Sequence, residues 1–205
     1  MSLIVFFILV ASVDAVGNVT QCPQGCSCQV TSYNRQLTVT SWQLTVDCGQ
    51  RLPFVDEEQL SHQLDSMLSA DNFVEHLTSL SITNTPLTRV PASVCKLLNL
   101  TSLNLNSNKL TELPDNCFTK LTKMVTLSAA YNAITRLQDG LFDGLQSLVN
   151  LALNGNRISF IGLRLLSNST DLTSLRSINL GYNKLTSLEP WPYSIVLYSV
   201  VSHLG

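Results

Sequence analysis

Four cysteines near the amino terminus are the side chains best placed for chemistry: Cys22, Cys26, Cys28 and Cys48. Thiols at this spacing either pair as disulfides or bind a metal such as zinc. Zinc is the weaker interpretation, because no pair of histidines accompanies the cysteines and a secretory leader precedes them. The sequence therefore predicts disulfides here, in one of the three pairings that four cysteines allow.

The other side chains that could perform catalysis are scattered along the chain. His62, His76 and His203 have no Asp, Glu or Cys at ligand spacing. Serines are abundant, but a nucleophilic serine needs a base oriented beside it, and no motif supplies one. The sequence also contains no Gly-rich phosphate loop, no Gly-x-Ser-x-Gly and no His-Glu-x-x-His. We therefore predict no enzymatic activity, no catalytic residue, no metal and no cofactor, and we expect function to come from the surface.

The charge balance of the 205-residue chain argues against one class of partner. Twelve basic and fourteen acidic residues give a net charge of −2, and only 13% of the residues are charged. A nucleic-acid-binding protein would show a basic excess. The composition therefore predicts no nucleic acid or other polyanion as partner, and the length fits one domain.

Most of the chain is built from one pattern, LxxLxLxxNxLxxLPxxxFxxL, which is clearest from Leu100 to Leu121. Registers of this pattern begin at Leu77, Leu100, Met124, Leu148 and Leu175. These starts are 23, 24, 24 and 27 residues apart, the period of leucine-rich repeats. In LxL the apolar residues alternate as in a β-strand, and one such strand cannot bury its leucines alone. Five repeats therefore predict an α/β-type solenoid, a leucine-rich repeat horseshoe segment with a parallel concave sheet.

Two columns of the pattern have structural explanations. Four repeats carry an asparagine at the turn that ends the strand: Asn108, Asn132, Asn156 and Asn183. An Asn side chain can both donate to and accept from turn amides, and Thr85 replaces it in the first repeat. Large apolar side chains recur at a later place, where they fill the core: Phe118, Phe142 and Leu166.

The chain divides into five predicted segments. Residues 1–17 form a secretory signal peptide, because their apolar run is too short to span a membrane. A cysteine-rich N-terminal cap (18–48), an irregular or helical first coil (49–76), five repeats (77–190) and a tail (191–205) follow. The tail has no recognisable cap, so it either ends a fragment or forms a cap of its own.

Two local signals precede the repeats. Alternating residues at 36–40 and 43–46 predict a β-hairpin in the cap. Apolar residues at helical spacing follow an acidic run at 56–58, which favours a helix packed on the solenoid. These apolar residues are Leu60, Leu64, Met67 and Leu68.

Two further features concern the surface of the repeats. Cys95 and Cys117 lie on the convex side of neighbouring repeats, and their spacing leaves a third disulfide and two free thiols both open. Three sequons predict glycosylation, at Asn18, Asn99 and Asn168.

The cysteines of the cap, spaced CxxxCxC and followed by Val46-Asp47-Cys48, together with the repeats resemble extracellular leucine-rich repeat proteins with a cysteine-rich N-terminal cap. Toll-like receptor ectodomains and slit-like or secreted matrix proteins belong to that group. The resemblance covers about residues 22–188 and implies the pairings Cys22–Cys28 and Cys26–Cys48. It also implies a secreted or cell-surface location and a non-enzymatic recognition role, innate immunity included.

The resemblance also indicates the partners. We expect a protein ligand or co-receptor, with a second copy of the chain as a further candidate. A membrane would be reached only through a further C-terminal part.

In the template, the residues flanking the strand leucines form the concave face, the extended surface with which such solenoids bind. This face is mostly hydroxyls and amides, with one charge and two tyrosines. The candidate ligand contacts are Tyr131, Tyr182, Asn104, Asn106, Asn154, Arg176 and Asn179. The two tyrosines occupy the same place two repeats apart, so at a strand spacing of about 4.8 Å they lie about 10 Å apart.

One ligand could therefore contact both tyrosines. We expect recognition of a protein or glycoprotein on the concave face, within a receptor ectodomain or a secreted protein. The alternative is a structural or adhesive protein of the extracellular matrix.

Overall fold

A computed structural model describes residues 22–23, 26–33, 41–47, 56–69, 71–162, 165 and 172–186. The elements before the second repeat are β1 (Ser27–Tyr33), β2 (Ser41–Asp47), α1 (Glu57–Leu68), α2 (Asp71–His76), β3 (Leu77–Thr83) and the 3₁₀ helix η1 (Ala92–Lys96). Those that follow are β4 (Ser102–Asn104), the 3₁₀ helix η2 (Phe118–Lys120), β5 (Thr126–Ser128), β6 (Arg136–Leu137), β7 (Asn150–Ala152), β8 (Phe160–Ile161) and β9 (Ser177–Asn179).

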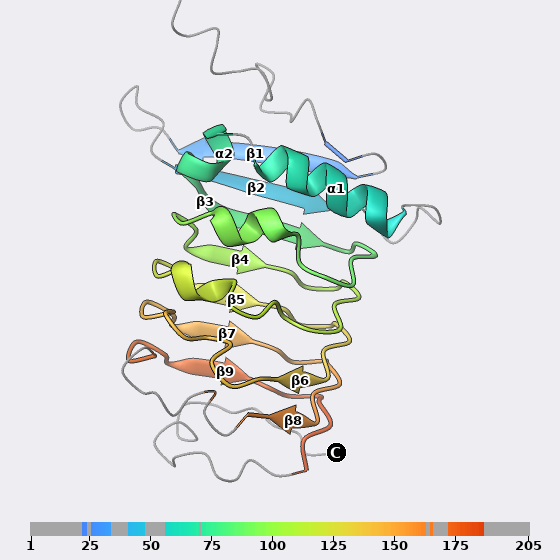
Figure 1. The fold of residues 1–205 in the computed structure, drawn as a ribbon, viewed down its shortest axis with the longest axis vertical. Helices are drawn as coiled ribbons and strands as arrows, with labels where there is room; N and C mark the ends of the chain where they lie inside the picture. Colours follow the sequence, from blue (N-terminus) through green and yellow to red (C-terminus); the bar gives the residue numbers. More distant parts are fainter. Residues whose placement is uncertain are drawn as a thin grey trace, which may run out of the picture.

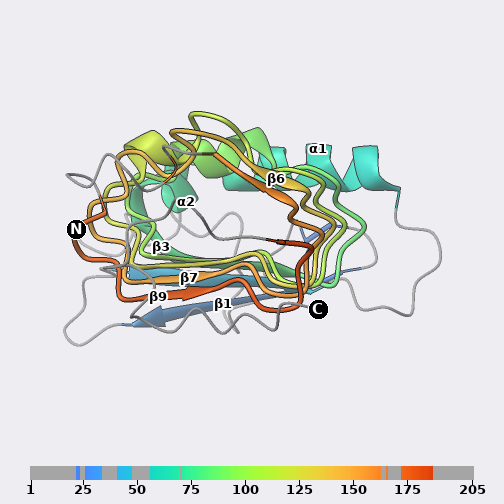
Figure 2. The same ribbon diagram turned by 90° about the horizontal axis from the view of Figure 1, so that it is seen from below.

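The chain winds into stacked turns along one long axis (Figure 1). One seven-stranded sheet runs along that axis in the order β1-β2-β3-β4-β5-β7-β9, and β6 pairs with β8 in a second sheet. Seen along the axis, the large sheet forms one layer, and the helices with β6 form the other (Figure 2). The α/β-type solenoid with a parallel sheet, predicted from the repeats, is confirmed.

Several sequence predictions fall outside the described residues. These are the signal peptide at 1–17, the strand at 36–40, the tail at 191–205, and the residues Asn18, Cys48, Leu166 and Asn168.

The repeat leucines stack in register through the large sheet. Leu80 pairs with Leu103, Leu103 with Leu127, Leu127 with Leu151, and Leu151 with Ile178. All five of these side chains are at most 3% exposed. Each leucine therefore packs against the same place in the next repeat, which is how repeats that could not fold singly stabilise one another.

The cap contributes a strand to the same ladder. Leu44 and Val46 of β2 pair in parallel with Leu80 and Ile82 of β3, and both are almost completely buried. β1 then pairs with β2 in antiparallel orientation, forming the outer strand of the sheet. The predicted second hairpin strand at 43–46 lies within β2, but its partner is Ser27–Tyr33, so the sequence placed the first strand too far along the chain.

Two disulfides are defined among the described residues. Cys22 bonds to Cys28, as the resemblance implied, and Cys26 is also disulfide-bonded, while its expected partner Cys48 lies outside the described residues. Cys95 bonds to Cys117 with a Cα–Cα distance of 4.8 Å. This second bond joins the convex sides of the first and second repeats, so of the two alternatives left open for these cysteines, the disulfide is correct and the free thiols are wrong.

α1 packs on the first repeat through the face that the sequence predicted. Its buried side chains are Leu60, Leu64, Met67 and Leu68. Asp56 caps the helix by accepting a hydrogen bond from the Gln59 N–H at 3.3 Å. Glu57 Oε1 accepts from the Thr88 N–H, and Asp65 Oδ1 accepts from the Ser93 N–H, both at 2.7 Å. The two carboxylates thus satisfy backbone donors of a coil about 30 residues further on, a contact that helical spacing alone does not reveal.

The asparagine column joins each turn to the one before it. Asn156 Nδ2 donates to the carbonyls of Ala129 and Leu153, both at 2.9 Å, and its Oδ1 accepts from the Ile134 N–H at 3.1 Å. Asn132, Asn108 and Asn183 bridge their neighbours in similar ways. Since an unsatisfied buried backbone group costs about 1–3 kcal/mol, this column stabilises every turn of the interior.

The first repeat uses a hydroxyl in place of the amide. Thr85 is buried, and its Oγ1 both accepts from the Leu87 N–H and donates to Asn108 Oδ1. Further along, Phe118 and Phe142 are fully buried with ring centroids 6.3 Å apart, as expected of a core column.

Candidate binding surface

We call the outward surface of the large sheet the sheet face, which is the concave face expected from the repeats. Its two most exposed large hydrophobic side chains are Tyr131 at 60% and Tyr182 at 67%. Both follow a strand of the large sheet, β5 and β9 respectively, at the end where the chain turns away. The sequence prediction of two exposed tyrosines in one column therefore agrees with the structure, whereas their role in binding stays a prediction.

The tyrosine column has an unusual backbone conformation in every repeat. Asn84, Ser107, Tyr131, Gly155 and Tyr182 all have positive φ, between 55° and 70°. This region costs a non-glycine residue roughly 1–2 kcal/mol, and bulky residues seldom adopt it. Inter-repeat hydrogen bonds hold the conformation, because the N–H groups of Ser107, Tyr131 and Gly155 donate to the following repeat at 2.9–3.0 Å. Tyr131 is therefore presented from a backbone that the next repeat holds in place, and Tyr182 shares its positive φ.

Gly155 supports the Tyr131 ring. A Cβ atom added to Gly155 would lie 2.6 Å from Tyr131 Cδ1 and 3.0 Å from Cε1, so the ring rests directly on the glycine. Any side chain at residue 155 would displace the ring. The last three repeats therefore carry Tyr131, Gly155 and Tyr182 at this place, and the Tyr131 ring packs against the glycine.

The amide candidates of the second repeat, Asn104 and Asn106, are used to brace the sheet. Asn104 Nδ2 donates to Ser81 Oγ at 3.2 Å, and its Oδ1 accepts from the Asn106 N–H at 3.1 Å. Asn106 Oδ1 accepts from Ser128 Oγ and from the Ala130 N–H, both at 2.7 Å. Three of these four contacts cross between repeats, so the sequence could not distinguish an amide that faces a ligand from one that holds two strands together.

The remaining candidates lie in the last two repeats. Asn179 Oδ1 accepts from the Gly181 N–H at 3.1 Å, and the Asn154 carbonyl accepts from the Tyr131 N–H at 2.9 Å. Arg176 is exposed and precedes β9, whereas Tyr182 follows it. The structure therefore puts the charged candidate and the tyrosines at opposite ends of the strands.

The sheet face carries small or apolar side chains in the third and fourth repeats. Val125 is 38% exposed, Val149 is half-buried, and Ala152 lies between the two tyrosine positions along the sheet. The first two repeats show hydroxyls and amides at the corresponding places. Val125 and Val149 precede their strands, at the end opposite the tyrosines, so a partner that buries apolar surface would gain it at both ends of the strands.

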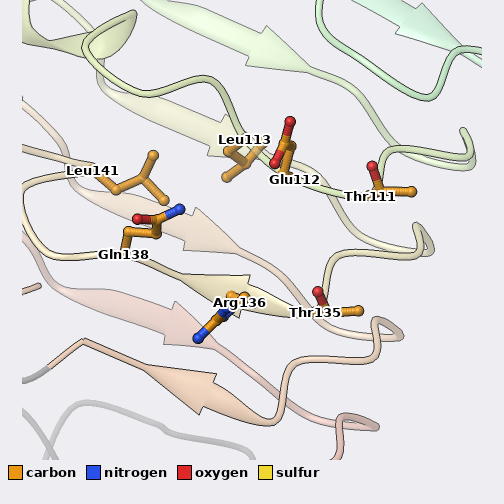
Figure 3. Close-up of a pocket in the computed structure, with 7 residues that line it drawn as sticks. All are labelled: Thr111, Glu112, Leu113, Thr135, Arg136, Gln138 and Leu141. Atoms are coloured by element: carbon orange, nitrogen blue, oxygen red, sulfur yellow. The ribbon is translucent and has the colours of Figure 1, made fainter.

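A small pocket lies away from the sheet face, between the second and third repeats (Figure 3). Its lining residues are Thr111, Glu112, Leu113, Thr135, Arg136, Gln138 and Leu141. This set contains no histidine or cysteine, and its hydroxyls have no imidazole beside them to act as a base. Across the described residues, no His, Cys, Asp and Glu cluster could hold a metal, and no helix is long and apolar enough to cross a membrane.

Comparison with protein families agrees with the repeat geometry. Residues 75–134 match the protein family described as leucine rich repeat. An internalin (inlF) from Listeria monocytogenes str. 4b F2365 is similar at 22% identity, over 70% of this chain and 44% of that chain, with a TM-score of 0.41. TLR13, solved as a complex with ssRNA13, is similar at 18% identity, over 78% of this chain and 35% of that chain, with a TM-score of 0.34. No curated protein matches the sequence.

This chain spans less than half the length of either solved structure. The in-register leucines, the asparagine column and the family match together define the fold as a leucine-rich-repeat solenoid. Domains of this class are generally protein-interaction modules, and they bind through extended surfaces.

Proposed function

We propose that this protein is an extracellular recognition module that binds a protein or glycoprotein ligand through its sheet face, within a receptor ectodomain or a secreted protein. The observation that carries the proposal is the exposed pair Tyr131 and Tyr182 on a constrained backbone. Tyrosine supplies a large contact area while losing little conformational freedom, which is why binding surfaces favour it. Because the Tyr131 ring already packs on Gly155, it loses even less conformational entropy when a ligand binds.

The disulfides support the extracellular part of the proposal. Cys22–Cys28 and Cys95–Cys117 are both formed, and disulfides persist mainly in oxidising compartments. The second bond joins two repeats of the solenoid. An oxidising environment would therefore stabilise the repeats as well as the cap.

The sequon at Asn99 is compatible with ligand binding beside the tyrosines. Asn99 lies just before the second repeat's strand, whereas the tyrosines follow their strands. Its Nδ2 donates to the Glu75 carbonyl at 2.8 Å, and a glycosylated Nδ2 keeps one N–H for that bond. We therefore expect a glycan here to cover the end of the sheet opposite the tyrosines.

The test begins with the full-length secreted chain, displayed as a tetramer and used to probe an array of purified ectodomains and secreted proteins. Any ligand found is then titrated against Tyr131→Ala, Tyr182→Ala and the control Arg176→Ala. Truncating a tyrosine at an interface centre costs about 2 kcal/mol, roughly a 30-fold weaker Kd. Little effect is expected from the control or from added salt, because the face carries little charge. Dominance of Arg176, or a steep salt dependence, would contradict the tyrosine assignment.

A structural or adhesive role in the matrix is the second candidate. The observation that favours it is the bracing network of Asn104 and Asn106, which stiffens the sheet face rather than leaving these amides to a ligand. Sedimentation velocity over a concentration series tests it, since a matrix or homodimeric role requires self-association. Self-association that survives loss of both tyrosines would favour this candidate over the first.

A further inference from the structure

A row of basic residues lies along one edge of the solenoid. Each repeat contributes one exposed Lys or Arg at the tenth or thirteenth place of its template, where the chain leaves the sheet face and starts back along the other layer. These residues, which we call the basic edge, are Arg89, Lys109, Arg136, Arg157 and Lys184. They are five of the twelve basic residues in the chain.

Acidic side chains are nearly absent from these template places. Glu112 is the one acidic residue there, and Glu57 of α1 reaches the same edge through its hydrogen bonds from Thr88, beside Arg89. The basic edge therefore carries a formal charge of 5 − 2 = +3 in a chain whose net charge is −2. Several of the other acids lie at the start of α1 and in the coils of the helix layer: Asp56, Glu58, Asp115, Asp139 and Asp143. The overall charge, which argued against any polyanion, therefore conceals a local excess of the opposite sign.

The backbone holds the three cations of the tenth template place at corresponding positions in their repeats. The N–H groups of Lys109, Arg157 and Lys184 each donate to a carbonyl of the preceding repeat at 2.9 Å. Neighbouring strands are about 4.8 Å apart, so the first and fifth cations are separated by about 19 Å along the axis. A row of charges at this spacing complements a linear polymer better than a compact ligand.

Two further features of the edge suit a sulfated sugar chain. Exposed hydroxyls recur at the twelfth template place and can donate to sulfate or sugar oxygens: Thr111, Thr135, Ser159 and Thr186. The Arg136 guanidinium lies 5.1 Å from the centre of the Phe160 ring, which supports its position while leaving it exposed.

We propose that the basic edge binds a linear sulfated polysaccharide running along the solenoid axis. The choice of polysaccharide over nucleic acid rests on the proposed extracellular setting and on the scarcity of stacking platforms, because single-stranded nucleic acids are held by several aromatic side chains. Among the described residues of this edge, the exposed aromatic is Phe160, and Arg136 already covers it. Binding to a polyanion of this kind is driven largely by counterion release and weakens with salt.

Heparin serves as the probe, with the full-length chain applied to a heparin column and eluted by a salt gradient. The test variant is Lys109→Ala/Arg157→Ala/Lys184→Ala. Its matched control is Lys96→Ala/Lys120→Ala/Arg176→Ala, which removes the same number of exposed cations from other surfaces. We expect the wild type and the control to be retained above roughly 150 mM salt, which is near physiological ionic strength. The test variant should elute clearly earlier.

A gain of binding provides the second readout. Glu112→Gln removes the acid from the edge and should delay elution, whereas Asp115→Asn, three residues away, should delay it less. Equal effects of the two triple variants would overturn the proposal, as would failure of the wild type to bind. Oligonucleotides that compete better than size-matched heparin, or desulfated heparin that binds equally, would overturn the assignment to a sulfated sugar.

The heparin experiment and the test of the tyrosines can fail independently of each other. Tyr131→Ala/Tyr182→Ala should keep its heparin retention, and the basic-edge variant should keep its affinity for a protein ligand of the sheet face. Melting temperatures of all variants within a few degrees of the wild type exclude unfolding as the cause of any loss.

Discussion

The first two repeats and the last three have the same interior but differ in how their surfaces are used. In the first two, side chains tie the structure together: Cys95 to Cys117, Glu57 to the Thr88 backbone, and Asn104 to Ser81. In the last three, the sheet face presents Tyr131 and Tyr182 to solvent instead. The difference indicates that repeats with the same interior can differ in whether their surface side chains bond within the protein or stay exposed to solvent.

The largest expected effect comes from removing the anchor between the first two repeats. A disulfide that closes a 22-residue separation stabilises by about 3 kcal/mol in the chain-entropy account, so Cys95→Ser/Cys117→Ser should lose about that much free energy of unfolding. Hydrogen exchange should show the loss mainly in the first two repeats, because repeats are coupled chiefly to their neighbours. Lys96→Ser/Lys120→Ser, in the same turns, is the control. A uniform loss of protection down to β9 would remove the distinction between the two regions.

The asparagine column should behave alike in both regions. Asn156→Ala leaves two carbonyls and one N–H without their side-chain partner, which should lower the free energy of unfolding by about 2–3 kcal/mol. Asn108→Ala should lower it by a similar amount, as measured by urea denaturation. If Asn108→Ala proved harmless while Asn156→Ala did not, the two interiors could no longer be treated as equivalent.

Gly155→Ala should destabilise by a further, smaller amount. Alanine at a φ of +70° costs about 1–2 kcal/mol, and its Cβ would also displace the Tyr131 ring. In a Tyr131→Ala background only the backbone part should remain, so a double-mutant cycle measures how firmly the ring is seated. Complete additivity of the two substitutions would contradict the contact between ring and glycine.

The smallest effect is expected at Ser107, the place in the second repeat that corresponds to Tyr131. Ser107 has a φ of +58°, so Ser107→Gly should raise the free energy of unfolding by about 0.5 kcal/mol, after allowance for the greater freedom of glycine when unfolded. Ser102→Gly, within strand β4, should instead lower it. The melting temperatures of the two variants should shift in opposite directions. A lower melting temperature in both would mean that the serine side chain does not strain this conformation, which the hydrogen-bond ladder alone then determines.

The periodic interior was predictable because one residue type recurs where one physical need recurs. Leu103, Asn132 and Phe118 each fill a place defined by the template, and each is buried as that place requires. The burial of Leu60 and Leu64 on α1 followed from spacing for the same reason.

Features that depend on distant or non-repeating partners were not predictable. No local pattern indicated that Asp65 would accept from Ser93, or that Asn106 would accept from Ser128. Nor did any pattern indicate positive φ at Tyr131, because tyrosine seldom adopts that conformation and only the inter-repeat ladder holds it there. The basic edge was also missed, since net charge sums over residues that the fold separates.

The reversed strand β1 has a consequence for how the length of such a protein can vary. β2 reproduces the register of a repeat strand, so on its own it would accept another parallel strand against its outer side. β1 occupies that side with the opposite chain direction and so removes the place where an additional repeat would dock. Duplication or loss of repeats during evolution is therefore directed to positions after β2, and the arc of the large sheet can lengthen or shorten in one direction only.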